Sequence, residues 1–174
     1  MRSGKYITAI LIAAAVSACG KIEKLPPEPS ISFTSFEIFD STDVLGNINK
    51  AGILKFHFQD GDGDIGLNAP VSSEEDSINL FLSVFRKTKS GYSVIISPED
   101  PLYTRGYRIP YMEREGQNKI MKGTISVTFM YLFFDQGDTI KYDFYIKDRA
   151  EHSSNVVSTC DITLDKNGIC GQMN

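Results

Sequence analysis

Apolar side chains recur at every second position in several separate stretches, and this alternation restricts the fold more than any other feature of the sequence. In residues 124–134 and 140–147, aliphatic and aromatic residues alternate with mostly polar ones. Successive side chains of a β-strand point to opposite faces of a sheet, so this spacing is typical of strands with one buried face. No segment after residue 20 shows a convincing helical period. The chain is therefore predicted to be all-β.

About seven strands follow from this pattern, and polar turns separate them. They are predicted at 31–39, 52–59, 78–87, 92–97, 124–134, 140–147 and 156–164. The alternation slips near Ser35, as a β-bulge would cause, and Lys89-Ser90-Gly91 is typical of a hairpin turn. This arrangement predicts an immunoglobulin-like antiparallel β-sandwich, with an open β-barrel as the alternative.

The first residues are typical of an export signal. Arg2 and Lys5 precede an apolar run at 7–16, which as a helix rises only about 15 Å, half the thickness of a bilayer core. The small residues before Cys19 resemble the lipobox of bacterial lipoproteins. That resemblance implies a signal peptide at 1–18 and acylation of Cys19; the alternative is an ordinary signal peptide with a chance cysteine.

Residues 19–30 are predicted to be a tether, because they contain three prolines and no periodic apolar pattern. Residues 31–174 would form the folded domain. Gly20 stands where an aspartate would imply inner-membrane retention under the proteobacterial sorting rule, so we expect an outer-membrane lipoprotein; whether it faces the periplasm or the cell surface stays open. The formal net charge of −4 disfavours nucleic acid as a partner, and contact with the membrane is expected through the lipid.

Three aspartates alternate with glycines directly after the predicted strand 52–59. Asp60, Asp62 and Asp64 offer carboxylate oxygens on a backbone that glycine allows to bend sharply, which suits calcium. The spacing does not fit an EF-hand, because Ile65 and Val71 occupy the positions of the required glycine and glutamate. Any site must therefore take further oxygens from elsewhere in the chain.

Those oxygens are expected from the loop that follows strand 140–147. The second and sixth strands of a sandwich end at the same pole, so Asp148 could complete the cage and Asn155 could add a carbonyl oxygen. Two alternatives remain at this point. Arg149 could neutralise the aspartates as a fork-shaped ion pair, or the acidic turn could simply be solvated.

The aspartate motif and two others resemble a group of uncharacterised lipoproteins from Bacteroidota. The residues that carry the resemblance are Phe58, Asp60, 62–66, 107–110, Gly123, 148–150, Ser154 and Asn155. The resemblance implies a small envelope β-domain without a known reaction. This chain has Glu151-His152 where glycine-asparagine would be expected, which puts a tight turn at those positions in doubt.

Two further sets of residues are candidates. Tyr103, Tyr107, Arg108 and Tyr111 occupy a long irregular stretch and could contact a glycan or an outer-membrane protein, or simply pack over the edge of the sandwich. Cys160 and Cys170 could form a disulfide in an exported chain. A tight turn at Asn167-Gly168 would place Cys170 opposite Asp165, so the bridge needs a wider loop. Free thiols remain the alternative.

No catalytic motif accompanies these features. The sequence lacks a metal-protease helix, a serine elbow and a paired-cysteine redox motif, and nothing singles out one pair of acids as a catalytic pair. We therefore predict that the protein is not an enzyme. The expected function is that of an outer-membrane-anchored binding or accessory module that calcium stabilises; the alternative is a structural envelope component with no small ligand.

Overall fold

The computed structural model describes residues 25–68, 78–113 and 119–171, whose regular secondary structure consists of β-strands. The prediction of an all-β domain is confirmed. The predicted signal peptide, Cys19 and the tether as far as residue 24 lie outside the described residues. No helix in the described part of the chain has the length and apolar character needed to cross a membrane.

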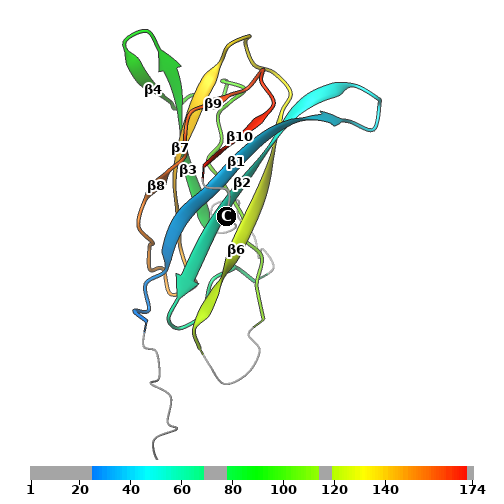
Figure 1. Cartoon of the computed structure of the whole chain (residues 1–174). Helices are drawn as coiled ribbons and strands as arrows, with labels where there is room; N and C mark the ends of the chain where they lie inside the picture. Colours follow the sequence, from blue (N-terminus) through cyan, green and yellow to red (C-terminus); the bar gives the residue numbers. More distant parts are fainter. Residues whose placement is uncertain (1–24, 69–77, 114–118, 172–174) are drawn as a thin grey trace, which may run out of the picture.

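Two antiparallel sheets pack face to face (Figure 1). The first has the order β10-β1-β2-β6, and the second has the order β4-β3-β7-β8 with β5 beside β3 and β9 beside β7. Sheet one contains β1 (Ser30–Thr42), β2 (Ile48–Asp60), β6 (Met121–Tyr131) and β10 (Gly168–Gly171). Sheet two contains β3 (Leu80–Thr88), β4 (Gly91–Ile95), β5 (Gly106–Tyr107), β7 (Thr139–Ile146), β8 (Val157–Ser158) and β9 (Ile162–Thr163).

This strand order corresponds to an immunoglobulin-like sandwich. The run β1-β2-β6 matches the A-B-E order of that architecture, and β4-β3-β7-β8 matches the order C′-C-F-G. The described strands are not closed into a barrel, so the alternative prediction is wrong. β10 is an addition that pairs with β1.

The predicted strands differ from the observed ones at a few places. The expected bulge is present, because the β1–β2 register shifts between Phe33 and Ser35. The single strand predicted at 156–164 is instead two short strands, β8 and β9. Between them the Thr159 hydroxyl, in place of a backbone carbonyl, accepts a hydrogen bond from the Tyr142 N–H at 3.0 Å. β5 and β10 were not predicted, because they are too short to show alternation.

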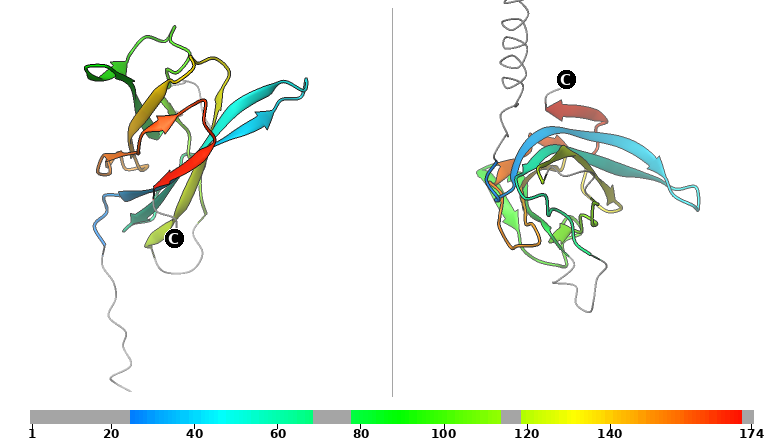
Figure 2. Two further views of the ribbon diagram at one scale, coloured as in Figure 1. Left: turned by 45° about the horizontal axis from the view of Figure 1, so that its top comes forward. Right: turned by 90° about the horizontal axis from the view of Figure 1, so that it is seen from below.

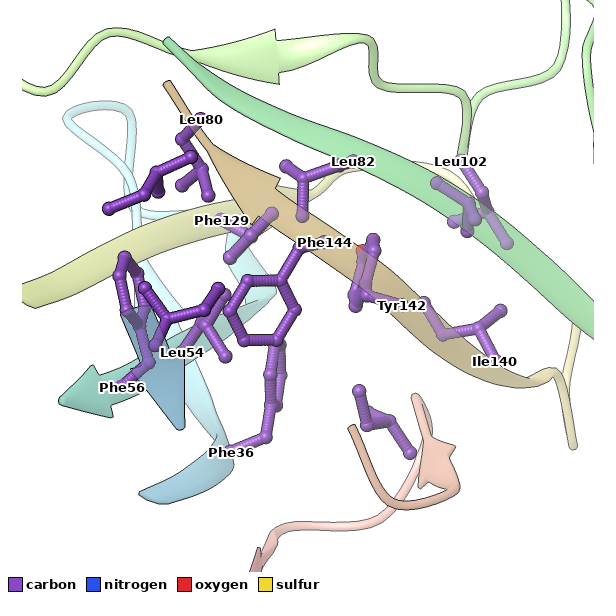
Figure 3. Packing of buried hydrophobic residues seen from close by; sticks show 14 of the residues in the cluster. Phe36, Leu54, Phe56, Leu80, Leu82, Leu102, Phe129, Ile140, Tyr142 and Phe144 are labelled. Carbon is purple, nitrogen blue, oxygen red and sulfur yellow. The ribbon is translucent and has the colours of Figure 1, made fainter. Parts of the chain in front are cut away.

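Aromatic side chains from both sheets form the centre of the core (Figure 3). Phe56 of β2 packs on Phe144 of β7 with ring centroids 5.3 Å apart, and Phe36 packs on Tyr142 at 5.9 Å. Each fully buried side chain of this size contributes roughly 1.5–3 kcal/mol of transfer free energy. The sheets are therefore fixed face to face along most of their length, which determines where the loops at each pole meet.

A disulfide joins Cys160 to Cys170, whose Cα atoms are 6.2 Å apart. Cys170 lies in β10 of the first sheet, opposite Phe36 of β1, whereas Cys160 lies between β8 and β9 of the second sheet. The chain crosses from one sheet to the other after β9, so no hairpin register governs the two cysteines. The disulfide links the two layers near their edge.

Candidate metal centre

Two loops that are far apart in the sequence meet at one pole of the sandwich. β2 ends at Asp60 and β7 ends at Ile146, and both strands run towards the end of the domain at which β1 begins (Figure 1). One carboxylate oxygen from each of Asp60, Asp62, Asp64 and Asp148 lies within 4.8 Å of the others. We call these four residues the aspartate cluster. The face-to-face packing of the two sheets thus brings together the side chains that the sequence pattern singled out.

Asp60 is the most deeply buried aspartate of the loop that follows β2. It continues the inward-facing row of β2 after Phe56 and Phe58, and only 1 % of its surface is exposed. Its Oδ2 accepts a hydrogen bond from the Asp64 N–H at 2.8 Å, which closes the loop over the positive-φ residue Gly63. Its Oδ1 is buried and has no hydrogen-bond partner among the described residues. A buried carboxylate oxygen without a donor is costly unless a cation compensates it.

Asp64 connects the two loops directly. Its Oδ2 accepts a hydrogen bond from the Ala150 N–H at 3.1 Å, and its carbonyl accepts one from the Arg149 N–H at 3.3 Å. Its Oδ1, like that of Asp60, is buried and finds no donor in the described part of the chain. The loops are therefore bonded to each other while carboxylate oxygens remain directed into the space between them.

Asp148 is fixed by its own loop. It is 1 % exposed, and its Oδ1 accepts a hydrogen bond from the His152 N–H at 2.8 Å. The His152 ring nitrogen Nδ1 lies 3.0 Å from its Oδ2, which raises the pKa of His152. Glu151 adopts a positive φ of 67° between them, so a tight turn is present although the chain has no glycine there.

Burial, reinforced by mutual repulsion, raises the pKa values of Asp60 and Asp64 in the aspartate cluster. Burial raises the pKa of Asp60 to about 6, and the charges of Asp62, Asp64 and Asp148 add to this effect. Burial likewise raises the pKa of Asp64, together with Asp148 and Asp62, against an opposing contribution from Arg149. Closely packed carboxylates that lack a counter-charge resist ionisation. A divalent cation among them would reverse this penalty.

Arg149 does not supply the counter-charge in the predicted manner. Its Nη1 donates to the carbonyls of Gly66 at 2.8 Å and Ile65 at 3.4 Å, and its guanidinium lies 4.9 Å from the centre of the Tyr111 ring. Across the described residues it forms no ion pair with a member of the aspartate cluster. The alternative of a fork-shaped pairing is therefore wrong. The merely solvated turn is also wrong, because Asp60 and Asp148 are buried.

Asn155 has a different role from the predicted one. Its side-chain Oδ1 accepts a hydrogen bond from the Ile31 N–H, and its Nδ2 donates to the Ile31 carbonyl, both at 2.9 Å. The amide thus imitates a neighbouring strand at the start of β1. Its carbonyl oxygen is used in this pairing and not as a ligand of the aspartate cluster.

The predicted contact residues are mostly used to build the domain. Tyr107 is half-buried and packs edge-on against Phe129 with centroids 5.0 Å apart. Arg108 donates to the carbonyls of Leu67, at 2.7 Å, and Asn68, and so ties its stretch to the loop after β2. Tyr103 is half-buried, and Tyr111 lies beneath Arg149. The contacts of Tyr107 and Arg108 match the alternative, in which these residues pack over the edge of the sandwich, and a contact with a glycan or protein stays a prediction.

The donor set of the aspartate cluster suits a hard cation. All the ligand atoms of the four carboxylates are oxygens. Calcium takes about six to eight oxygens in flexible geometry, including those of bidentate carboxylates. A cluster of Asp60, Asp62, Asp64 and Asp148 could thus hold a metal ion. The loops that carry them are already bonded to each other, so little rearrangement is needed on binding.

Comparison of the chain with protein-family models, with curated proteins and with solved structures finds no match in any of the three. Function is therefore inferred from the geometry of this pole and from the sequence of the chain.

Proposed function

We propose that the protein is a lipid-anchored, non-catalytic binding or accessory module of the outer membrane whose sandwich is stabilised by calcium. The aspartate cluster carries the calcium part of this proposal. The lipobox-like residues before Cys19 and the resemblance to Bacteroidota lipoproteins support the envelope location. The alternative is a structural envelope component without a ligand.

Calcium is the cation that the aspartate cluster favours best. The oxygens of the aspartate cluster come from two separate loops, a set that adapts to seven- or eight-fold coordination more readily than to the strict octahedron of magnesium. Among the described residues, the buried Oδ1 atoms of Asp60 and Asp64 have no hydrogen-bond donor, which supports a bound cation over an empty cavity. Calcium bound to the folded state alone would stabilise it by about 2.7 kcal/mol at a free concentration 100 times the Kd.

Thermal unfolding with calcium and with a chelator tests the ion. The wild type is expected to melt at a higher temperature in millimolar calcium. Asp60→Asn keeps the shape of the side chain and removes one charge, so it should lose most of this shift while gaining stability in chelator. Glu99→Gln, on an exposed side chain, is the matched control for charge removal and should behave as the wild type. An identical melting temperature with and without calcium would reject the proposal.

Exposed apolar side chains at the other pole support a protein partner. Val44 and Leu45 lie at the tip of the β1–β2 hairpin, which projects beyond the sandwich (Figure 2), and they are 102 % and 83 % exposed. Asp43 fixes this tip, because its Oδ1 accepts hydrogen bonds from the Leu45 and Asn47 N–H groups, both at 2.9 Å. Rigidly presented aliphatic groups suit an apolar pocket on another protein better than a glycan.

Crosslinking in cells distinguishes the accessory module from the structural component. A photo-crosslinking residue at Val44 should capture one defined envelope protein, whereas the same residue at the exposed Lys89 should not. Leu45→Asp should abolish the product at Val44. Equal, diffuse crosslinking at both positions would favour the structural alternative.

Cys19→Ala should abolish labelling by palmitate and release the protein from the membrane, which tests the anchor separately.

A further inference from the structure

The last residues of the tether lie against the first loop of the aspartate cluster. The carbonyl oxygens of Leu25 and Pro26 approach Gly61 so closely that a Cβ added to Gly61 would clash with both of them. Gly61 lies between Asp60 and Asp62, so this backbone contact is adjacent to two carboxylates. Its φ is not in the left-handed region, so the absence of a side chain there serves the contact and not the turn.

The same segment also contacts the second loop. Asn155 binds the backbone of Ile31 through two hydrogen bonds, both of 2.9 Å. Pro29, between these two contacts, is buried. Residues 25–31 therefore cross the pole and rest on both loops that supply the aspartate cluster.

Contact with both loops makes the position of the tether depend on how closely the loops approach. Without a cation, Asp60, Asp62 and Asp64 on one loop and Asp148 on the other repel each other. A divalent cation shared by the two loops would remove this repulsion and hold the bonded loops together. Residues 25–31 contact both loops, so holding the two loops together also holds the surface on which this segment rests.

We propose that a divalent cation bound by the aspartate cluster clamps residues 25–29 onto the domain, and so fixes the direction in which the domain extends from its membrane anchor. The clamp rests on the proposed calcium binding and adds a regulatory role to it. When the cation leaves, these five residues join the free tether and extend its reach by about 15 Å at about 3.1 Å per residue. The hairpin tip at Val44 and Leu45 then loses its defined orientation to the membrane.

Hydrogen–deuterium exchange on the purified full-length protein in detergent, with calcium or with chelator, tests the clamp. Calcium should slow exchange at 61–68 and at 148–155, and it should slow exchange at 25–31 to a similar degree. Protection of the two loops without any change at 25–31 would overturn the clamp and leave the calcium site intact. No calcium-dependent protection anywhere would overturn both proposals.

Gly61→Ala separates the clamp from the ligands. The added methyl group should displace residues 25–26 and abolish calcium-dependent protection of 25–31, while 61–68 still gains protection. Coupling between two binding events is reciprocal, so calcium affinity by titration calorimetry should fall at least about fivefold. Gly168→Ala is the matched control, because a Cβ there meets nothing within 4 Å. Calcium affinity and protection of 25–31 that equal the wild type in Gly61→Ala would contradict the clamp.

Discussion

Asp60, at the end of β2, and Asp148, directly after β7, are each only 1 % exposed and direct carboxylate oxygens to within 4.8 Å of each other. The strands β2 and β7 belong to different sheets, and the fold brings the two aspartates together only because both strands end at the same pole. Two buried acids in such proximity destabilise the protein unless a proton or a cation intervenes. The pH dependence of the metal-free protein follows from this relationship.

The metal-free protein is expected to be more stable in mild acid than at neutral pH. The pKa of Asp60 in the folded state is raised to about 6 from its ordinary 3.8. A raised carboxyl pKa contributes stability that is fully present below about 3.8 and is lost as the pH rises through about 6. Urea unfolding in chelator should therefore give about 1–3 kcal/mol more stability near pH 5 than near pH 7.5.

Asp60→Asn provides the control for this pH dependence, because it cannot titrate. The stability of this variant in chelator should change much less between the two pH values. In the wild type, calcium should raise the stability at neutral pH and so remove the difference between the two pH values. A wild-type protein that is equally stable in chelator at both pH values would show that the cluster ionises without cost.

Glu151 occupies a backbone conformation that favours glycine, with a φ of 67° in the turn between Asp148 and His152. A non-glycine residue in this conformation lowers the stability by about 1–2 kcal/mol. Glycine removes this strain, but it costs roughly 0.5–1 kcal/mol because it loses more conformational entropy on folding. Glu151→Gly should therefore stabilise the protein by about 0.5–1 kcal/mol in chemical denaturation. Glu151→Ala is the matched control, because it also loses the exposed ion pair to Lys147 but keeps the strained φ. Equal effects of the two substitutions would exclude backbone strain as the cause.

Tyr131 and Tyr142 share a hydrogen bond of 2.9 Å between their hydroxyl groups inside the core. Tyr142→Phe would leave the Tyr131 hydroxyl buried without its partner, at a cost of about 1–3 kcal/mol. The double variant Tyr131→Phe, Tyr142→Phe removes both polar groups and should recover most of this loss. Urea unfolding of the two single variants and the double variant measures the coupling. Additive losses in the double variant would show that the two hydroxyl groups do not depend on each other.

The sequence predicted the long strands because one buried face imposes a strict alternation, as in β7 with its inward Ile140, Tyr142, Phe144 and Ile146. It also predicted that the loops after β2 and β7 would meet, since that follows from strand direction in a two-sheet sandwich. The sequence pattern missed β5 and β10, which are short and are defined by pairing with β3 and β1 respectively.

Side-chain roles that depend on long-range contacts were also beyond the sequence pattern. Tyr107 looks like a recognition residue until Phe129 covers its ring, and Arg149 looks like an ion-pair partner until the Gly66 carbonyl accepts its hydrogen bond. These outcomes depend on which residue from a distant part of the chain lies beside the side chain, and local composition does not encode that. The burial of Asp60 was different, because its even-numbered position already continued the inward row of Phe56 and Phe58.

The side-chain amide of Asn155 is matched to both backbone groups of Ile31. Asn155→Asp keeps the acceptor for the Ile31 N–H but replaces the donor with a carboxylate oxygen that faces the Ile31 carbonyl. This change should destabilise the protein by about 1–3 kcal/mol and speed amide exchange at the start of β1. Asn155→Ala removes both bonds without the repulsion, so it should cost less than the aspartate. If Asn155→Asp retained wild-type stability and exchange at 30–32, the amide would not be what fixes β1 to the second loop.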